Sequence, residues 1–323
     1  MNNKKSNNNQ LLMTLLKGRT FIVLVLLVIF FTIVKGTTFL SASTLTMVAK
    51  HVALYGILAL GMTFVIITGG IDLSVGSILG LSGVLASGVL ASTGNTAAAV
   101  AVSLVVGVAC GAVNGFFVSV CGIPPFISTL GMMTLLRGVI LVYTKGSPIP
   151  IKSDAYKFFG KGSIAGIPVP VIILIIVFLL AHYILTQTSY GRSVYAVGGN
   201  REAARLSGIR VKTSEFLVYT LNGLMCGMAG LILTARLGSA QSTSGTGIEM
   251  DAIAAVILGG TSLSGGVGFV LPTVVGAMIM GIIDNILTLM NVNPHATNIV
   301  KGAVILIAVL VDKKVKDLSA KAE

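Results

Sequence analysis

The sequence is poor in charged and aromatic residues. Only 10% of its 323 residues are Asp, Glu, Lys or Arg, 6% are aromatic and none is tryptophan. Its mean hydropathy of +0.98 and its 39 glycines lie outside the range of soluble globular domains. The composition therefore excludes a soluble globular domain and indicates an integral membrane protein.

Motifs that carry chemistry are also absent. The chain contains no GxxxxGK[ST] phosphate loop, no HExxH and no GxSxG, which excludes ATP hydrolysis by a phosphate loop and two common hydrolase mechanisms. Cys110, Cys121 and Cys226 are isolated in apolar runs, and the three histidines lie far apart in sequence. We therefore expect no disulfide, no metal site, no catalytic residue and no cofactor bound by this chain itself.

What the chain does contain is apolar runs long enough to cross a membrane, each of which needs roughly 20 residues. We predict an all-α polytopic membrane protein with about ten transmembrane helices in one domain, 20–312, between terminal tails 1–19 and 313–323. No polar segment is long enough for a soluble domain. The predicted spans are 20–34, 52–68, 73–94, 96–120, 123–144, 166–186, 216–236, 251–263, 267–290 and 296–312.

The basic residues cluster between spans, and Lys and Arg are enriched in cytoplasmic segments. The three clusters precede the first span, follow the sixth in the loop 187–215, and follow the last. Ten spans place all three clusters on one side of the membrane, with both termini in the cytoplasm. Because the basic residues lie between spans rather than on a polar face, we expect no nucleic-acid partner. A second interpretation of the N-terminus is a signal peptide, but Lys35 stands where small residues precede a cleavage site, so a retained anchor fits better.

Glycines recur at helical spacing within the predicted spans, as in Gly107, Gly111 and Gly115, and again in Gly223 and Gly227. Small residues three or four apart allow helices to approach closely in lipid. These glycines predict tight helix packing.

Two stretches interrupt the spans with glycine and serine: "VIITGGIDLSVGS" at 65–77 and "VILGGTSLSGG" at 256–266. Aligning Gly69-Gly70 with Gly259-Gly260 also pairs Leu73 with Leu263 and Ser74 with Ser264, which resembles a parallel internal repeat. Irregular backbone at membrane depth must be buried in protein or line a water-filled cavity. The two breaks therefore predict a polar translocation pathway, with Gly69, Gly70, Asp72, Ser74, Gly259, Gly260, Thr261, Ser262 and Ser264 as its candidate residues.

Charged residues are few within the predicted spans and the break at 65–77, where charge is costly. Asp72 lies in the first break and either caps the following helix or contacts substrate. Asp284 and Lys301 reach similar depths on antiparallel spans, so we predict that they pair in a structural role. Arg137 has no partner that the sequence reveals.

The loop 187–215 resembles a known family. Its "NREAARLSGI" contains Glu202-Ala203-Ala204 followed by Gly208, similar to the signature of permease subunits of binding-protein-dependent ABC importers. Together with "GIDLSVGS", "YAVGGN", "GTGIEMDAIAAVILGGTSLSGG" and "VKGAVILIAVLVD", the resemblance covers the chain from about residue 20 and is strongest to ribose-type monosaccharide permeases.

This resemblance implies an ABC importer permease fold in the cell membrane, with a second permease subunit, a cytoplasmic ATPase that binds the ATP, and an extracellular or periplasmic sugar-binding protein. It also implies a coupling helix that docks on the ATPase. The candidate coupling residues are Gly199, Asn200, Glu202, Ala203, Ala204, Arg205 and Gly208. Glu202 and Arg205 are three apart and can pair, and Ala203 with Ala204 would leave a small-residue surface for the partner.

A lysine-rich segment on the opposite side, 145–165, becomes a candidate docking surface for the binding protein by charge complementarity, through Lys145, Lys152, Lys157 and Lys161. The loop 237–250 is a second candidate for that surface. The alternative function is a secondary sugar transporter driven by an ion gradient, which the repeats, the breaks and Asp72 also fit. The coupling loop argues against it, because that loop has no purpose without an ATPase.

Overall fold

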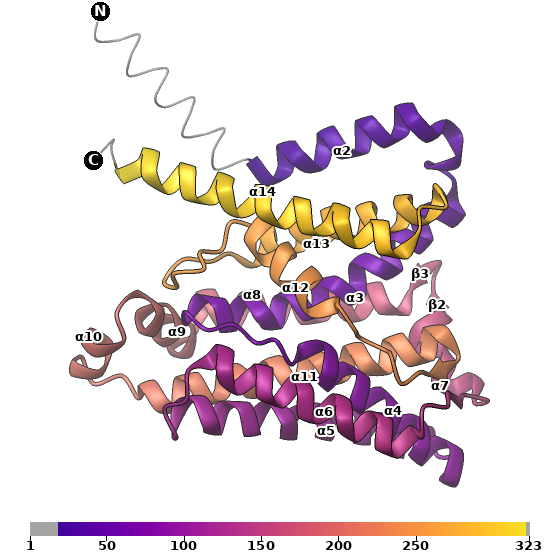
Figure 1. Cartoon of the computed structure of the whole chain (residues 1–323), viewed down its shortest axis with the longest axis horizontal. Coiled ribbons are helices and arrows are strands. Elements are labelled where there is room, and N and C mark those ends of the chain that lie inside the picture. Colours follow the sequence, from indigo (N-terminus) through magenta and orange to yellow (C-terminus); the bar gives the residue numbers. More distant parts are fainter. Residues whose placement is uncertain (1–18, 321–323) are drawn as a thin grey trace, which may run out of the picture.

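The computed structural model describes residues 19–320, and within them helices coincide with all ten predicted spans (Figure 1). Eight of the described helices are long and apolar enough to cross a membrane. The ten helices are α2 (Arg19–Lys35), α3 (Ala42–Ile67), α4 (Val75–Thr93), α5 (Thr96–Ser119), α6 (Pro125–Thr144), α8 (Val169–Gln187), α11 (Val211–Leu237), α12 (Ile248–Leu258), α13 (Val270–Leu289) and α14 (Pro294–Ala320).

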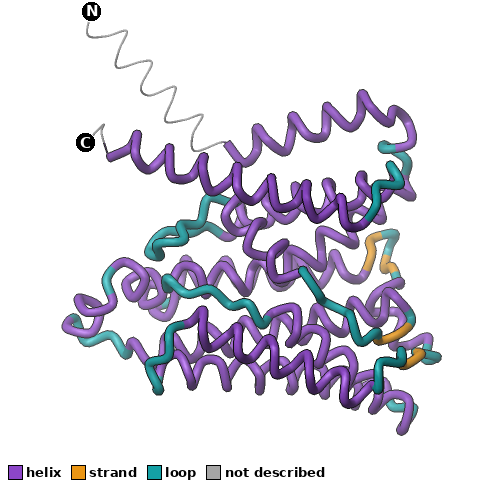
Figure 2. The backbone as a smooth tube through the Cα atoms, in the orientation of Figure 1, coloured by secondary structure: helices purple, strands orange, loops and turns teal. Residues whose placement is uncertain are grey.

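The remaining elements are short and lie at the ends of the bundle (Figure 2). They are η1 (Gly36–Thr38), β1 (Ile149–Pro150), α7 (Asp154–Lys161), β2 (Ser163–Ile164), β3 (Ile167–Pro168), α9 (Ser189–Gly199), α10 (Arg201–Leu206) and β4 (Ser239–Ala240). Strand β1 pairs antiparallel with β4, and β2 pairs antiparallel with β3. The strands and α7 mark one end of the bundle, named here the α7 end, and α9 with α10 marks the opposite α10 end (Figure 1).

Local sequence signals explain where several helices begin and end. The side chain of Ser41 accepts a hydrogen bond from the Thr44 amide at the start of α3, and Asn95 does the same for Ala98 at the start of α5. Helix α4 ends at Gly94, which is left-handed with φ +66° and therefore tolerates the C-terminal turn better than a residue with a side chain.

Helices α5 and α11 are joined by the glycines that the sequence singled out. A Cβ added to Gly107 would lie 2.3 Å from the Gly223 carbonyl oxygen, and one added to Gly223 would lie 2.2 Å from the Gly107 carbonyl oxygen. The two backbones therefore touch, which confirms the predicted tight packing. Helix α3 lies buried beside α8, α11, α12 and α13 at the centre of the bundle.

One predicted span is shorter in the structure than a membrane crossing requires. Helix α12 has only 11 residues, about 16 Å at 1.5 Å per residue, because Gly259 and Gly260 end it and Gly247 precedes it. Helix α14 continues past the predicted end of the last span at Asp312 to Ala320, so the predicted C-terminal tail is helical as far as that residue. The predicted N-terminal tail lies outside the described residues except for Arg19, and Lys321 also lies outside them.

Candidate functional site

Helix α10 is a six-residue helix with a cap at each end. The Asn200 side-chain oxygen accepts hydrogen bonds from the amides of Glu202, at 3.1 Å, and Ala203, at 2.9 Å. At the other end Gly208 is left-handed, with φ +82°, and its amide donates to the Arg205 carbonyl. Asparagine before the helix and glycine after it are the residue types that these two cap geometries favour.

One face of α10 packs on the bundle and the other is open. Ala204 is 4% exposed and packs with Val197 and Val211. The predicted small-residue surface is therefore wrong in part, because Ala204 faces inward, and Leu206, 75% exposed, lies on the open side instead. The open residues are Glu202, Ala203, Arg205 and Leu206.

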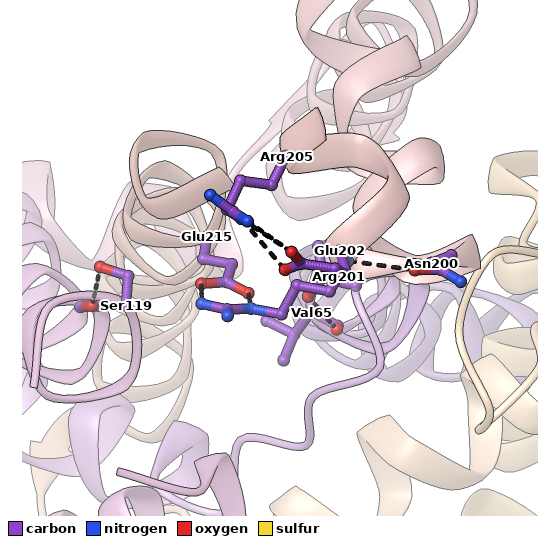
Figure 3. Close-up of polar contacts among 9 residues, drawn as sticks. Val65, Ser119, Asn200, Arg201, Glu202, Arg205 and Glu215 are labelled. Atoms are coloured by element: carbon purple, nitrogen blue, oxygen red, sulfur yellow. Dashed lines mark hydrogen bonds and ion pairs between the residues drawn. The ribbon is translucent and has the colours of Figure 1, made fainter. Parts of the chain in front are cut away.

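The predicted pairing of Glu202 with Arg205 is confirmed, with 3.1 Å between the Arg205 Nε and Glu202 Oε2 atoms (Figure 3). Both side chains are mostly exposed, so the pair contributes little to stability. The hydrogen bonds and charge of Arg205 hold the pKa of the Glu202 carboxyl below its usual value. The α10 surface therefore keeps both charges over the physiological pH range.

A second ion pair, which the sequence did not reveal, ties α10 to α11. Arg201 donates from Nε to Glu215 Oε1 at 2.8 Å and from Nη2 to Glu215 Oε2 at 3.1 Å (Figure 3). This two-point geometry is stronger and more directional than a single contact. The Glu215 side chain is only 10% exposed, and its hydrogen bonds raise the pKa of the Arg201 guanidinium.

The first break starts with a helix-ending turn at the α10 end. The Gly69 amide donates to the Ile66 carbonyl at 2.9 Å, and the Gly70 amide donates to the Val65 carbonyl at 3.1 Å. Gly69 has φ +82°. These are the two hydrogen bonds and the left-handed residue of a Schellman motif.

The second break starts with the same turn. The Gly260 amide donates to Ile257 at 2.8 Å, the Thr261 amide donates to Val256 at 3.2 Å, and Gly260 has φ +81°. Gly260 is therefore the counterpart of Gly69, so the predicted alignment of the two glycine pairs is one residue out of register at this point.

The predicted register holds a few residues further along. The Ser74 amide donates to the Asp72 carboxylate at 2.9 Å, and the Ser264 amide donates to the Ser262 hydroxyl at 3.2 Å. These matching turns place Asp72 with Ser262 and Ser74 with Ser264, as the sequence alignment did. Each break thus contains a helix-ending turn followed by a polar turn. The spacing between these two turns is one residue shorter in the second break than in the first.

Asp72 is fully buried in a polar network. Its carboxylate also accepts from the Ser74 hydroxyl at 2.6 Å and from the Asn222 amide group at 2.8 Å, and Asn114 donates to that hydroxyl at 2.7 Å. The Asp72 carboxylate accepts from the amide of Ser74, which is itself the N-cap residue of α4, so Asp72 lies two residues before the cap position. A role for Asp72 in the pathway stays a prediction.

The end of α9 lies in backbone contact with both breaks. A Cβ on Gly198 would lie 1.7 Å from the Ile67 carbonyl oxygen and 2.6 Å from the Gly266 nitrogen. The Gly266 amide donates to that same Ile67 oxygen at 2.9 Å, and Gly265 lies beside Gly69. We name these five residues the glycine junction. The end of α9 therefore contacts both breaks through backbone atoms, without an intervening side chain.

A cleft of about 290 Å³ opens beside the first break at the α10 end. It is lined by the break, the turn between α5 and α6, and the Arg201–Glu215 pair. Gly69 is exposed there, whereas Gly70, Ser74, Gly259, Thr261 and Ser262 are buried. The structure thus brings the coupling candidates and the two breaks together at one end of the bundle.

The predicted pairing of Asp284 with Lys301 is confirmed, with 2.9 Å between Oδ1 and Nζ. Lys301 also lies 3.0 Å from Asp251, and Tyr55 donates to Asp284 at 2.8 Å. The sequence did not reveal Asp251 or Tyr55 as partners. Arg137, for which the sequence offered no partner, donates to the Ser244 carbonyl at 2.7 Å.

The four candidate docking lysines all belong to the segment at the α7 end. Lys145, Lys152 and Lys161 are exposed, and the half-buried Lys157 pairs with Asp154 at 3.1 Å. Their contact with a binding protein stays a prediction.

A bundle of apolar helices with two glycine-rich breaks, both in backbone contact with the end of α9, is the architecture of a multi-pass membrane permease. Residues 44–309 match a family described as the permease component of branched-chain amino acid transport systems, and the chain belongs to this permease family.

Individual relatives are similar over most of their length. The ribose import permease protein RbsC of Escherichia coli (strain K12) is 49% identical over 280 residues, which are 85% of this chain and 87% of that protein. RbsC of Bacillus subtilis (strain 168) is 46% identical over 91% of this chain and 92% of that protein. The D-allose transport system permease protein AlsC of E. coli (strain K12) is 39% identical over 92% of this chain and 91% of that protein. No solved structure gives a significant match.

Proposed function

We propose that this chain is the membrane permease subunit of an ATP-driven importer of D-ribose. The observation that carries the proposal is the glycine junction, which joins the end of α9, directly before α10 in the chain, to both membrane breaks. Ribose is proposed because relatives named ribose import permeases reach 49% identity over most of both chains.

In this proposal the α10 end faces the cytoplasm and holds both chain termini. A separate ATPase docks on Glu202, Ala203, Arg205 and Leu206, and ATP binds to that partner alone. The neighbouring cleft, about 260 Å³ and lined by Arg201, Arg205, Arg210 and Lys212, suits acidic side chains of such a partner. Five basic residues of the loop 187–215 accord with the cytoplasmic orientation.

The mechanism follows from the backbone contacts. Closure of the ATPase displaces α10, the Arg201–Glu215 pair carries α11 with it, and the glycine junction transmits the displacement to both breaks. The pathway then opens alternately to one side of the membrane and to the other. The irregular backbone at Gly69, Gly259 and Gly260 lines part of this pathway. A second copy of the chain completes that pathway, and a sugar-binding protein delivers ribose at the α7 end.

Uptake of radiolabelled ribose by the complete importer in proteoliposomes tests the proposal. We expect uptake that needs enclosed ATP and survives a proton ionophore. Glu202→Ala combined with Leu206→Arg should abolish ATP-driven uptake, while Ser92→Ala, an exposed side chain near the α7 end, should leave it unchanged. Uptake that persists without ATP and collapses with the ionophore would instead support the gradient-driven alternative, which the importer names of the relatives do not favour.

A further inference from the structure

The chain between β4 and α12 descends into the bundle without forming a helix. A Cβ on Gly80 would lie 2.8 Å from the Ser244 carbonyl oxygen, and one on Gly76 would lie 2.2 Å from the Gly245 carbonyl oxygen. Gly80 is 13 residues before Thr93 at the far end of α4, which is about 20 Å at 1.5 Å per residue. Residues 241–247, named here the descending segment, therefore reach the middle of the membrane.

The descending segment has no apolar side chain. Its sequence is "QSTSGTG", and Gln241, Thr243 and Thr246 are exposed in the single chain. Lipid-exposed irregular backbone does not occur in the hydrocarbon region, because its polar groups would stay unpaired. The exposed side of this segment therefore faces water or a polar interface rather than lipid.

Two charged side chains and an unpaired hydroxyl accompany the segment. Arg137 donates from Nη1 to the Ser244 carbonyl at 2.7 Å, and Glu249 Oε1 accepts from the Gly247 amide at 3.2 Å. Among the described residues, the buried Glu249 Oε2 and Ser244 Oγ atoms have no hydrogen-bond partner, and Ser244 is only 7% exposed. Buried polar atoms are rarely left unpaired, so these two indicate a ligand that is absent from this conformation.

We propose that the descending segment, Arg137 and Glu249 form a subsite that binds the hydroxyl groups of the sugar during its passage. A carboxylate accepts hydrogen bonds from sugar hydroxyls, and a guanidinium donates to them. The two charges cancel, which suits a neutral sugar better than a sugar phosphate. Glu249 Oε2 lies against Gly76 here, so the sugar reaches it when α4 and the descending segment separate. This subsite rests on the proposed function and lies closer to the α7 end than the glycine junction does.

Cysteine labelling tests whether the segment faces the aqueous route. In an importer whose three native cysteines are replaced by alanine, Thr246→Cys should react with a membrane-impermeant charged thiosulfonate. Ser92→Cys, exposed near the α7 end, is the positive control, and Val142→Cys, a 79% exposed apolar position on α6, is the lipid-facing control. Labelling of Thr246→Cys no faster than that of Val142→Cys would overturn the proposal.

Transport stoichiometry tests whether the subsite handles sugar. For Glu249→Gln we expect ATP hydrolysis stimulated by the binding protein to stay within about twofold of wild type, while ribose moved per ATP falls about tenfold, the size of one lost charged hydrogen bond. Glu249→Asp should restore part of the ratio, and Ser92→Ala should not change it. A wild-type ratio in Glu249→Gln would overturn the subsite.

The two levels of proposal fail differently. If the wild-type importer moves no ribose with ATP, the proposed function fails, and the stoichiometry is measured with the sugar that is moved. If the wild type moves ribose but Thr246→Cys stays unlabelled, only the subsite fails. If the Glu249→Gln importer does not assemble, a second measurement tests sugar contact: ribose added during turnover should slow the reaction of Thr246→Cys with the thiosulfonate. An unchanged labelling rate would contradict sugar contact.

Discussion

Gly198 lies against Ile67 so closely that a Cβ at position 198 would come within 1.7 Å of the Ile67 carbonyl oxygen. That oxygen already accepts the Gly266 amide, so it cannot move without loosening the second break. One carbonyl group thus holds three segments of the chain together.

Gly198→Ala is therefore expected to destabilise the permease by about 2 kcal/mol, since an added methyl group in a packed site forces the backbone to shift. Gly199→Ala is the matched control, because a Cβ at position 199 meets no atom within 4 Å. Melting temperatures of the purified proteins in detergent measure both. Equal melting temperatures for the two variants would contradict the contact.

The Arg201–Glu215 pair predicts an asymmetry between its two partners. Arg201→Ala leaves a carboxylate that is 10% exposed without its partner, whereas Glu215→Gln leaves a guanidinium that is 58% exposed and reaches water. We expect Arg201→Ala to cost about 1–3 kcal/mol of stability and Glu215→Gln less than 1 kcal/mol. Thermal unfolding of both variants checks the order, and a larger loss for Glu215→Gln would contradict it.

Lys301 lies between two carboxylates, so its removal should be more harmful than removal of either acid. Lys301→Met removes the ion-pair partner of buried Asp251 and leaves Asp284 with only His51, at 3.6 Å, as a close basic group, so it is expected to cost about 3–5 kcal/mol. Asp284→Asn leaves the ion pair between Lys301 and Asp251 in place and should therefore cost less stability than Lys301→Met. The yield of folded protein after membrane extraction measures this. Exchanging the charges of Asp284 and Lys301 should rescue only partly, since Asp251 would then face a carboxylate.

The contact between α5 and α11 predicts that Gly223→Ala impairs folding, because its methyl group would lie 2.2 Å from the Gly107 carbonyl oxygen. We expect a loss of about 1–3 kcal/mol. Gly138→Ala on α6 meets no atom within 4 Å and serves as the control. Size-exclusion profiles and melting temperatures compare the two, and similar profiles would show that the helices can separate freely.

The lysines of the α7 end predict a salt effect on delivery of sugar. Replacing Lys145, Lys152, Lys157 and Lys161 by glutamine should flatten the dependence of ribose uptake on ionic strength, because steering by charge is screened by salt. Lys35→Gln with Lys50→Gln, outside that segment, is the control. Unchanged salt sensitivity of the fourfold variant would remove these lysines from the docking surface.

The sequence predicts the helices and α10 well because their signals are local. Apolar runs near 20 residues specify the spans, and Asn200 with Gly208 brackets one short helix. The Glu202–Arg205 pair was predictable for the same reason, since its members are three residues apart on one helix.

The sequence did not predict contacts between distant segments. Arg201 and Glu215 are separated by a turn whose path no local pattern specifies, and Gly198 meets Ile67 only because α8 returns beside α3. The one-residue shift between Gly69 and Gly260 is visible only in backbone hydrogen bonds. Asp251 was missed because its partner Lys301 lies 50 residues further along the chain.

The shortness of α12 has a consequence for how the chain enters the membrane during synthesis. An 11-residue helix with Glu249 and Asp251 in its first turn is too short and too acidic to be inserted as a span by itself. Its buried carboxylate acquires a counter-ion only when Lys301 on α14 has been made. Helices α12, α13 and α14 therefore reach their final positions together, only after Lys301 has been synthesised.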